Sequence, residues 1–297
     1  MTPPVFSRSR RRLAAVVAAF HLAVPAAEVE PAPNPTGSGA GLAHNHGIST
    51  DLIRQHRLKR LDARLTTEPA VLREQCRYES EISTAPPHKK VVLTFDDGPE
   101  PGQTELILET LNRYKIPAAF FLVGHKAQEH PELVEKIKAT GQHVIGNHSW
   151  DHPNFHVIEP SAQATEVEKT RATLPINKVQ NYFRYPFGNS TCETNVLLRS
   201  MGYGIIGWHI DSCDWAFDRT GAVDTKEAMI CGVLPQHQQD YVNHVVSTVR
   251  AHHGGIVLMH EIHPNTIKQL EKIIQAIYAG GYVFASIEDP GFSSSIR

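Results

Sequence analysis

Short apolar runs alternate with longer amphipathic stretches from residue 91 to the end of the chain. The apolar runs predict seven buried strands, at 91–95, 117–123, 143–147, 181–184, 203–209, 255–259 and 282–287. The amphipathic stretches predict helices at about 103–115, 131–140, 161–173, 192–201, 241–252 and 265–279. Strands that alternate with helices are typical of a parallel sheet. The pattern therefore predicts an α/β fold, either an incomplete barrel or an open doubly wound sheet.

The first part of the chain does not follow this alternation. Four arginines between Arg8 and Arg12 precede an apolar stretch, Leu13 to Val24, and small residues follow near Ala26. This order is typical of a signal peptide, with a basic tail of a cytosolic protein as the alternative. We expect residues 1–27 to be the signal peptide and the protein to reach the periplasm, the cell envelope or the medium.

The remaining boundaries follow from composition. Residues 28–87 begin rich in Pro and Gly and are expected to form a linker with a short helical segment. The folded domain is expected at 88–290 and a short tail at 291–297. No apolar run is long enough for a membrane-spanning helix, so no integral membrane segment is expected after signal cleavage.

Charge and cysteine content narrow the function classes. The formal net charge is -2, which lacks the basic footprint of a nucleic-acid-binding protein, so no nucleic-acid partner is expected. The four cysteines, Cys76, Cys192, Cys213 and Cys231, show no C-x-x-C spacing. In an exported protein they could form disulfides with three full connectivities, and free buried thiols are the alternative.

Polar side chains that could take part in catalysis or metal binding follow the ends of the predicted strands. They are Asp96 and Asp97 after the first strand, His148 and His152 after the third, Arg184 at the end of the fourth, Asp211 to Trp215 after the fifth and His260 after the sixth. In a parallel α/β fold the carboxyl ends of the strands lie on one rim. We therefore expect these segments to converge on one mouth.

The histidine pair is ambiguous when taken alone. With 18 histidines in the chain, a pair spaced like His148 and His152 arises by chance. The pair lies, however, in a loop-forming segment directly after a strand. Two imidazoles and one carboxylate are a common ligand set for a catalytic metal that keeps a position open for water. Two surface histidines that cap a loop are the alternative.

The other polar groups have similar alternatives. Asp96 and Asp97 precede Gly98, so an ordinary turn competes with a pair in which one carboxylate holds metal and the other faces substrate water. Arg184 could hold a carboxylate ionised or form a surface ion pair. His260 ends an apolar run and could be a proton donor or a core histidine.

Five ordered segments resemble a known family. They are Thr94-Phe95-Asp96-Asp97-Gly98-Pro99, His148-Ser149-Trp150-Asp151-His152, Arg184-Tyr185-Pro186-Phe187-Gly188, Asp211-Ser212-Cys213-Asp214-Trp215 and Leu258-Met259-His260. Together they resemble the motifs of the polysaccharide deacetylase family, also called the NodB-homology domain or carbohydrate esterase family 4. The resemblance covers about residues 88–290, which would then be the catalytic domain.

The resemblance implies a distorted (β/α) barrel of about seven parallel strands that binds a divalent metal. Zinc is the first expectation, with cobalt, nickel and manganese as alternatives. Carried over to this chain, Asp97, His148 and His152 would be the metal ligands. Asp96 would be the general base, and Arg184 would hold it ionised and oriented.

The resemblance also implies the other half of the site. His260 would protonate the departing amine, with Asp214 paired to it. Trp215 and Leu258 would form the walls of the pocket for the acetyl methyl group. The backbone N–H near Phe187 would help to bind the oxyanion. The partner would be a polysaccharide or oligosaccharide substrate.

The sequence departs from the family pattern at several points. Phe187 stands where Tyr is frequent, and Glu261 stands where Asp is frequent. The segment 216–240 is long and is expected to form a lid or a substrate wall. Because Cys213 lies inside the fourth motif, we predict a Cys213–Cys231 disulfide that tethers this segment.

The predicted function is hydrolysis of N-acetyl groups on N-acetylglucosamine-type residues of peptidoglycan, chitin oligomers or poly-N-acetylglucosamine. An O-acetyl esterase of the acetylxylan type is the main alternative, because the same machinery cleaves esters. A non-haem iron oxygenase also uses two histidines and a carboxylate, but it has no use for Asp96, Arg184 and His260. A catalytically silent carbohydrate-binding domain would have lost the base or the acid, and this sequence retains both Asp96 and His260.

Overall fold

A computed structural model describes the chain at residues 55, 57–59, 62, 66–67, 71, 76–80, 82–175 and 181–297. The predicted signal peptide and residues 28–50 lie outside the described residues. Within the described ranges, no helix has both the length and the apolar character that crossing a bilayer requires.

Strands and helices follow one another along the described chain, in large part in the predicted order. The strands are β1 (Lys90–Gly98), β2 (Ala118–Leu122), β3 (Val144–Asn147), β4 (Asn181–Phe183), β5 (Tyr203–Ile205), β6 (Ile210–Asp211), β7 (Gly255–His260) and β8 (Val283–Phe284). The α-helices are α3 (Gln103–Tyr114), α4 (Gly124–Glu129), α5 (Pro131–Ala139), α6 (Pro160–Thr173), α7 (Cys192–Ser200), α8 (Asp214–Thr220), α9 (Thr225–Cys231), α10 (Tyr241–Ala251) and α11 (Pro264–Ala279). Short 3-10 turns lie at Pro186–Gly188, Pro235–His237 and Pro290–Ser295.

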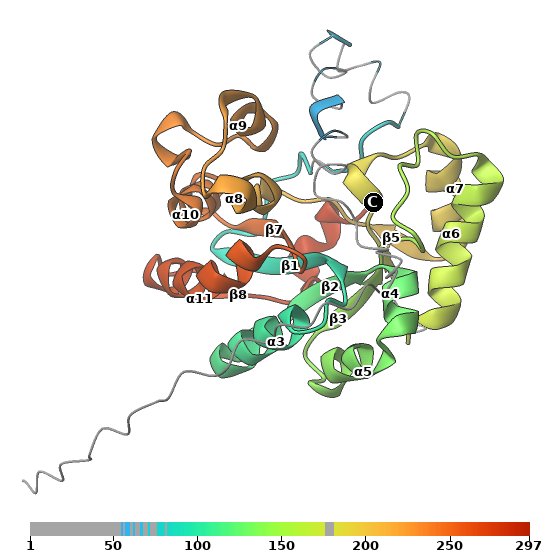
Figure 1. Ribbon diagram of the computed structural model, residues 1–297, viewed down its shortest axis with the longest axis horizontal. Coiled ribbons are helices and arrows are strands. Elements are labelled where there is room, and N and C mark those ends of the chain that lie inside the picture. The colour runs from blue at the N-terminus through green and yellow to red at the C-terminus, as the bar shows by residue number, and fades with distance from the viewer. Residues whose placement is uncertain are drawn as a thin grey trace, which may run out of the picture. The chain divides into compact units, whose positions relative to one another are not determined.

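The strands form one parallel sheet that curls into a half-barrel. Seven strands lie in the order β5-β4-β3-β2-β1-β7-β6, and β8 pairs with the start of β1. Figure 1 shows helices lying outside this sheet, with α3 and α11 beside the central strands. The predicted α/β fold with a distorted barrel of about seven parallel strands is confirmed.

Two layers of apolar side chains follow from the alternation along the strands. In β1, Val91, Leu93 and Phe95 belong to the large cluster that includes side chains of α3 and α11. Val92 belongs instead to a second cluster inside the curled sheet, together with Phe121. Successive strand side chains point to opposite faces, so one strand supplies both layers. The polar site lies at the carboxyl ends of these strands.

The predicted strand at 203–209 is interrupted, and this corrects the sequence interpretation. β5 ends at Ile205, and Ile206 then forms an antiparallel bridge with Ile296 near the C-terminus. Trp208 pairs through its backbone with Ser80 and Ile82. The apolar run continues, and its backbone hydrogen bonds are shared between neighbouring strands, at Phe183 and Ile256, and the two ends of the domain, at Ser80 and Arg297.

One disulfide joins distant parts of the chain and the other closes a short loop. Cys76 bonds to Cys192 at the start of α7. Cys213 bonds to Cys231, as predicted, and this bond closes the segment that contains α8 and α9. The sequence interpretation did not predict these two helices or α4. No described cysteine is free, so the alternative of free thiols is wrong.

Candidate metal and catalytic site

A bulge at the end of β1 directs two adjacent carboxylates toward the mouth of the half-barrel. The register between β1 and β2 shifts between Asp96 and Gly98, so Asp97 is the extra residue. Asp97 has a left-handed backbone with φ of 72°. A bulge re-aims a side chain that would otherwise alternate to the opposite face. Asp96 and Asp97 are therefore both buried at the site, although they are neighbours in the sequence.

The loop after β3 supplies two histidines. The Nδ1 atom of His148 lies 2.8 Å from the carbonyl oxygen of Arg184. Because a carbonyl only accepts, Nδ1 is the donor, and in the neutral ring Nε2 keeps its lone pair. His152 follows with φ of 55°, and its N–H donates to the Ser149 hydroxyl at 3.1 Å. A left-handed backbone at a residue other than glycine is uncommon, and such residues cluster at functional sites.

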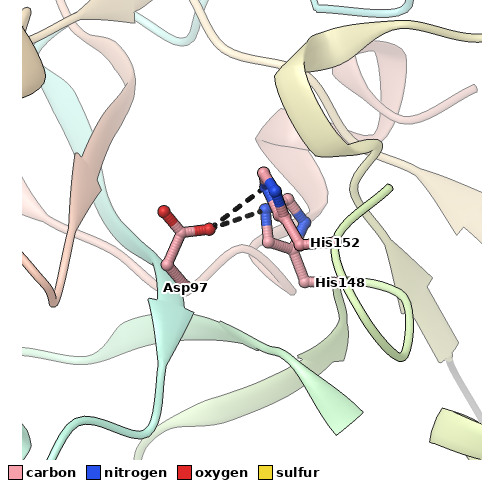
Figure 2. A group of neighbouring side chains, drawn as sticks. All are labelled: Asp97, His148 and His152. Carbon is pink, nitrogen blue, oxygen red and sulfur yellow. Dashed lines mark ion pairs between the residues drawn. The ribbon is translucent and has the colours of Figure 1, made fainter. Parts of the chain in front are cut away.

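Asp97, His148 and His152 form a compact group that could hold a metal ion. Figure 2 shows the Asp97 carboxylate directed at both imidazole rings. Its Oδ1 atom lies 3.4 Å from Nε2 of His148 and 3.3 Å from Nε2 of His152. The ligand atoms of all three residues lie within 4.8 Å of one another, and all three residues are buried. One carboxylate and two imidazoles are a suitable ligand set for zinc with a position left open.

The hydrogen bonding and electrostatics of this group fit a cation. Neither carboxylate oxygen of Asp97 has a hydrogen-bond partner among the described residues, although both are buried. Burial alone would raise the pKa of Asp97, but attraction to His152, His148 and His260 outweighs it and holds the pKa well below its usual range. Burial lowers the pKa of His152 to about 3, which leaves its imidazole neutral and able to ligate. A buried carboxylate without a donor favours a bound cation.

Asp96 is held by a different partner. Its Oδ1 atom accepts a hydrogen bond of 2.7 Å from Nη1 of Arg184, which also donates to the Thr94 hydroxyl at 2.7 Å. The other guanidinium nitrogens of Arg184 donate to the carbonyl oxygens of Ile206 and Gly207. Burial lowers the pKa of Arg184, and Asp96 opposes that effect. The guanidinium thus fixes Asp96 from inside the half-barrel.

A second histidine–carboxylate pair lies across the site. Nδ1 of His260 lies 2.7 Å from Oδ1 of Asp214. Burial opposes the imidazolium form, but Asp214 outweighs it and raises the pKa of His260 to about 9. His260, Asp214 and His263 also form a buried group whose ligand atoms are close enough together to hold a metal ion.

The hydrogen bonds of Asp214 distinguish this second candidate metal group from the group that contains Asp97. Its two oxygens accept from His260 N–H, from the Trp215 N–H and from the Thr266 hydroxyl, in addition to the His260 ring. A carboxylate with this many donors has its lone pairs occupied, whereas the Asp97 oxygens are available. The first group is therefore the better candidate metal site.

The predicted pocket residues lie at different depths. Leu258 and Phe187 line the cavity together with Trp208 and Tyr185. The Phe187 ring lies 4.6 Å from the His152 ring, edge to face. Trp215 is buried beside this cavity but is not among its lining residues.

The place of Arg57 in the site and the burial of Glu261 were not found from the sequence. Arg57, from the segment expected to be linker and short helix, lines the same cavity and is only 4% exposed. Nothing in its local sequence distinguishes it from the other arginines nearby. Glu261 is fully buried, and its carboxylate accepts from the Thr104 hydroxyl. Burial raises its pKa to about 8, so this residue is largely protonated at neutral pH.

Comparisons with known proteins show which proteins this chain resembles. Residues 83–206 match the family model for polysaccharide deacetylase. A peptidoglycan-N-acetylglucosamine deacetylase of Listeria monocytogenes is 30% identical over 213 residues, which cover 70% of this chain and 40% of that protein. A chitooligosaccharide deacetylase of Rhizobium leguminosarum bv. trifolii is 29% identical, covering 67% of this chain and 90% of that protein.

A solved structure resembles the fold. It is the peptidoglycan N-acetylglucosamine deacetylase Bc1960, which is 24% identical and superposes with a TM-score of 0.58 over 74% of this chain and 95% of that chain. At this identity the likeness concerns the fold alone. This chain spans about two fifths of the Listeria protein. The match to the family model and the similarity to these relatives show that residues 83–206 carry a domain of the polysaccharide deacetylase family.

Proposed function

We propose that this chain is a metal-dependent hydrolase that removes N-acetyl groups from N-acetylglucosamine-type residues of a polysaccharide. One observation carries the proposal. The group formed by Asp97, His148 and His152 lines a single cavity with Asp96 and His260, while both oxygens of Asp97 are buried without a hydrogen-bond donor.

Asp96 is the proposed general base. Amide hydrolysis requires a group that takes a proton from water as the water attacks the acetyl carbonyl. The hydrogen bond of Asp96 with Arg184 through Oδ1 leaves Oδ2 directed at the site, 3.6 Å from Nε2 of His148. This carboxylate is thus oriented before substrate binds.

His260 is the proposed general acid. The amine of an amide leaves only after its nitrogen has been protonated. Because Asp214 raises the pKa of His260 to about 9, the imidazolium form is available at neutral pH. Asp214 also holds Nδ1, which orients Nε2 toward the cavity. The proposed base and the proposed acid therefore have separate charged partners, Arg184 and Asp214.

A divalent cation bound by Asp97, His148 and His152 would polarise the acetyl carbonyl and lower the pKa of a water molecule toward about 7. Leu258 and Phe187 border the space for the acetyl methyl group. The backbone N–H near Phe187 is the proposed further donor to the oxyanion. Zinc is the proposed metal, because its preferred ligands are those of this group.

The proposed substrates are peptidoglycan, chitin oligomers or poly-N-acetylglucosamine, and export to the cell envelope or beyond would bring the enzyme to them. The names of the similar deacetylases from Listeria and Rhizobium support a glucosamine-based substrate. An O-acetyl esterase is the second candidate, because the same base, acid and metal ligands could cleave an ester.

The test is acetate release by the metal-reconstituted full chain from peptidoglycan, chitin oligomers and acetylxylan. We expect release from an N-acetylated polymer, and we expect a chelator to abolish it. Asp96→Asn should lower the rate about 10²- to 10⁴-fold, the usual contribution of a general base. The metal content of this variant, measured by elemental analysis, should stay at the wild-type level.

The matched control is Glu132→Gln, which neutralises a carboxylate whose side chain is 61% exposed, outside the cavity. This variant should keep full activity. Full activity in Asp96→Asn would show that the base is misassigned. Release from acetylxylan alone would favour the esterase.

A further inference from the structure

Arg57 reaches the candidate site from a segment that precedes the parallel sheet. Residues 57–59 are helical, and of these three only Arg57 is buried. Its Nη2 atom lies 3.4 Å from Nε2 of His260. The guanidinium of Arg57 therefore stands against the atom from which the proposed acid would donate its proton.

A carboxylate and two indole rings surround the guanidinium of Arg57. Nη1 of Arg57 pairs with the Asp211 carboxylate, whose side chain is 9% exposed. The guanidinium carbon lies 5.0 Å from the centre of the Trp215 ring and 5.9 Å from that of Trp208. A carboxylate and indole faces are the groups that attract a guanidinium or an ammonium ion.

This guanidinium occupies space that a substrate needs. If His260 protonates the departing nitrogen, that nitrogen must lie within hydrogen-bond reach of Nε2, which is where Nη2 of Arg57 lies. The cavity that remains beside Arg57 has a volume of about 10 Å³. This is about the room that one water molecule needs, so an acetamido sugar does not fit.

We propose that Arg57 is an internal occluding residue that fills the subsite for the sugar nitrogen. In the closed state its guanidinium takes the place of the protonated amine that the reaction would produce. A polysaccharide binds only after Arg57 has withdrawn. The inference rests on the proposed deacetylase function for the identity of the excluded ligand, but the cation subsite itself does not depend on that function.

Two described contacts lie further along the chain from Arg57. Cys76 is bonded to Cys192. Another contact of the segment is the ion pair of Asp62 with Lys226 at 3.4 Å, in which both side chains are more than half exposed. Exposed pairs of this kind contribute little stability. Among the described residues of this segment, Arg57 therefore makes the buried contacts that a substrate must compete with.

The first test is steady-state acetate release by the metal-loaded full chain. Arg57→Ala should lower KM by about tenfold at unchanged kcat, because the open state no longer competes with a closed one. The matched control is Lys59→Ala, which removes an exposed cation two residues away and should leave both constants unchanged. A raised KM or a lowered kcat in Arg57→Ala would mean that Arg57 serves the substrate and would overturn the proposal. An unchanged KM would overturn it as well.

The second test does not depend on catalysis. Saturation-transfer NMR would measure binding of ethylguanidinium to the full chain. We expect binding to Arg57→Ala, where the subsite is vacated, and at least tenfold weaker binding to the wild type. Adding Asp211→Asn to Arg57→Ala should abolish binding. Equal binding to the wild type and to Arg57→Ala would contradict occlusion.

The two tests separate the two proposals. If no variant releases acetate from any polymer but ethylguanidinium binds as expected, the proposed function is wrong and the occluded cation subsite stands. If acetate is released but ethylguanidinium binds equally to the wild type and to Arg57→Ala, the occlusion is wrong and the deacetylase function stands.

Discussion

Arg184 carries out its role inside the half-barrel instead of on its surface. Its side chain is fully buried, and its hydrogen bonds join Asp96 and Thr94 of β1 to the carbonyl oxygens of Ile206 and Gly207 after β5. One residue thus connects the two sides of the curled sheet below the candidate site. Removing one partner of a buried ion pair leaves the other charge without compensation.

Arg184→Met should therefore lower the free energy of unfolding by about 3–5 kcal/mol, because Asp96 stays buried without its cation. Urea unfolding followed by circular dichroism would measure this loss. The matched control is Arg113→Met, since Arg113 forms ion pairs at the surface with a side chain that is 50% exposed. An equally small effect of both substitutions would show that Asp96 does not depend on Arg184.

At the scale of elements, the segment between β6 and α10 is built around one covalent bond. Cys213 has a left-handed backbone with φ of 59° and directly precedes Asp214, the first residue of α8. The bond to Cys231 joins this point to the end of α9. The disulfide therefore restrains the residue that orients His260, as well as the segment around it.

Replacing both cysteines, as Cys213→Ala with Cys231→Ala, should lower the free energy of unfolding by about 3 kcal/mol, the value expected for a short closed loop. Because Asp214 would be less firmly held, His260 would be less well oriented and the rate of acetate release should fall. The metal content should fall less, because Asp214 is not one of the proposed metal ligands. Urea unfolding, acetate assays and elemental analysis would measure the three quantities. A variant as stable and as active as the wild type would show that packing alone positions α8.

At the scale of the whole molecule, buried titratable groups make stability depend on pH. The pKa of His260 is raised to about 9, so its contribution is fully present below pH 6.5 and is lost as the pH rises through 9. Burial raises the pKa of Glu261 to about 8. Its carboxyl therefore also makes stability fall as the pH rises, between about pH 4.5 and 8. Burial lowers the pKa of His143 and His209 to about 4, so their penalty grows as the pH falls below 6.5.

Chelator-treated protein should therefore lose stability between pH 6.5 and 9, by about 3 kcal/mol from His260 if each pKa unit contributes about 1.4 kcal/mol. Urea unfolding at a series of pH values would measure the decline. In His260→Gln the part of the decline between pH 8 and 9 should disappear, because the Glu261 carboxyl has largely titrated by then. A persistent decline in this range would assign it to another group.

The fold and most of the candidate site could be predicted because their signals are local. The alternation of apolar and amphipathic runs defined the order of β1, α3, β2 and their successors, and parallel strands place their carboxyl ends on one rim. Polar residues at those ends, such as Asp97 and His148, were therefore expected to meet. The Cys213–Cys231 bond was also within reach, because one of its cysteines lies inside a motif.

Other features had no local signal. The Cys76–Cys192 bond joins residues that are 116 positions apart, and the pairing of Ile206 with Ile296 spans a similar stretch of chain. The apolar run at 203–209 has the composition of a strand, but composition does not state which partner takes its hydrogen bonds. The place of Arg57 depends on how its segment packs, since an arginine in a polar stretch is ordinarily exposed.

By itself, the sequence determined the alternating α/β architecture and the set of residues at the mouth, because periodicity and motif order are properties of neighbouring positions. Only the tertiary structure decided which carboxylate lies open to a cation and which is saturated with donors, because hydrogen-bond partners come from distant strands and loops. It also decided that the guanidinium of Arg57, which precedes the parallel sheet, lies against His260. Burial and partnership depend on the whole packed molecule, and periodicity along the chain does not encode them.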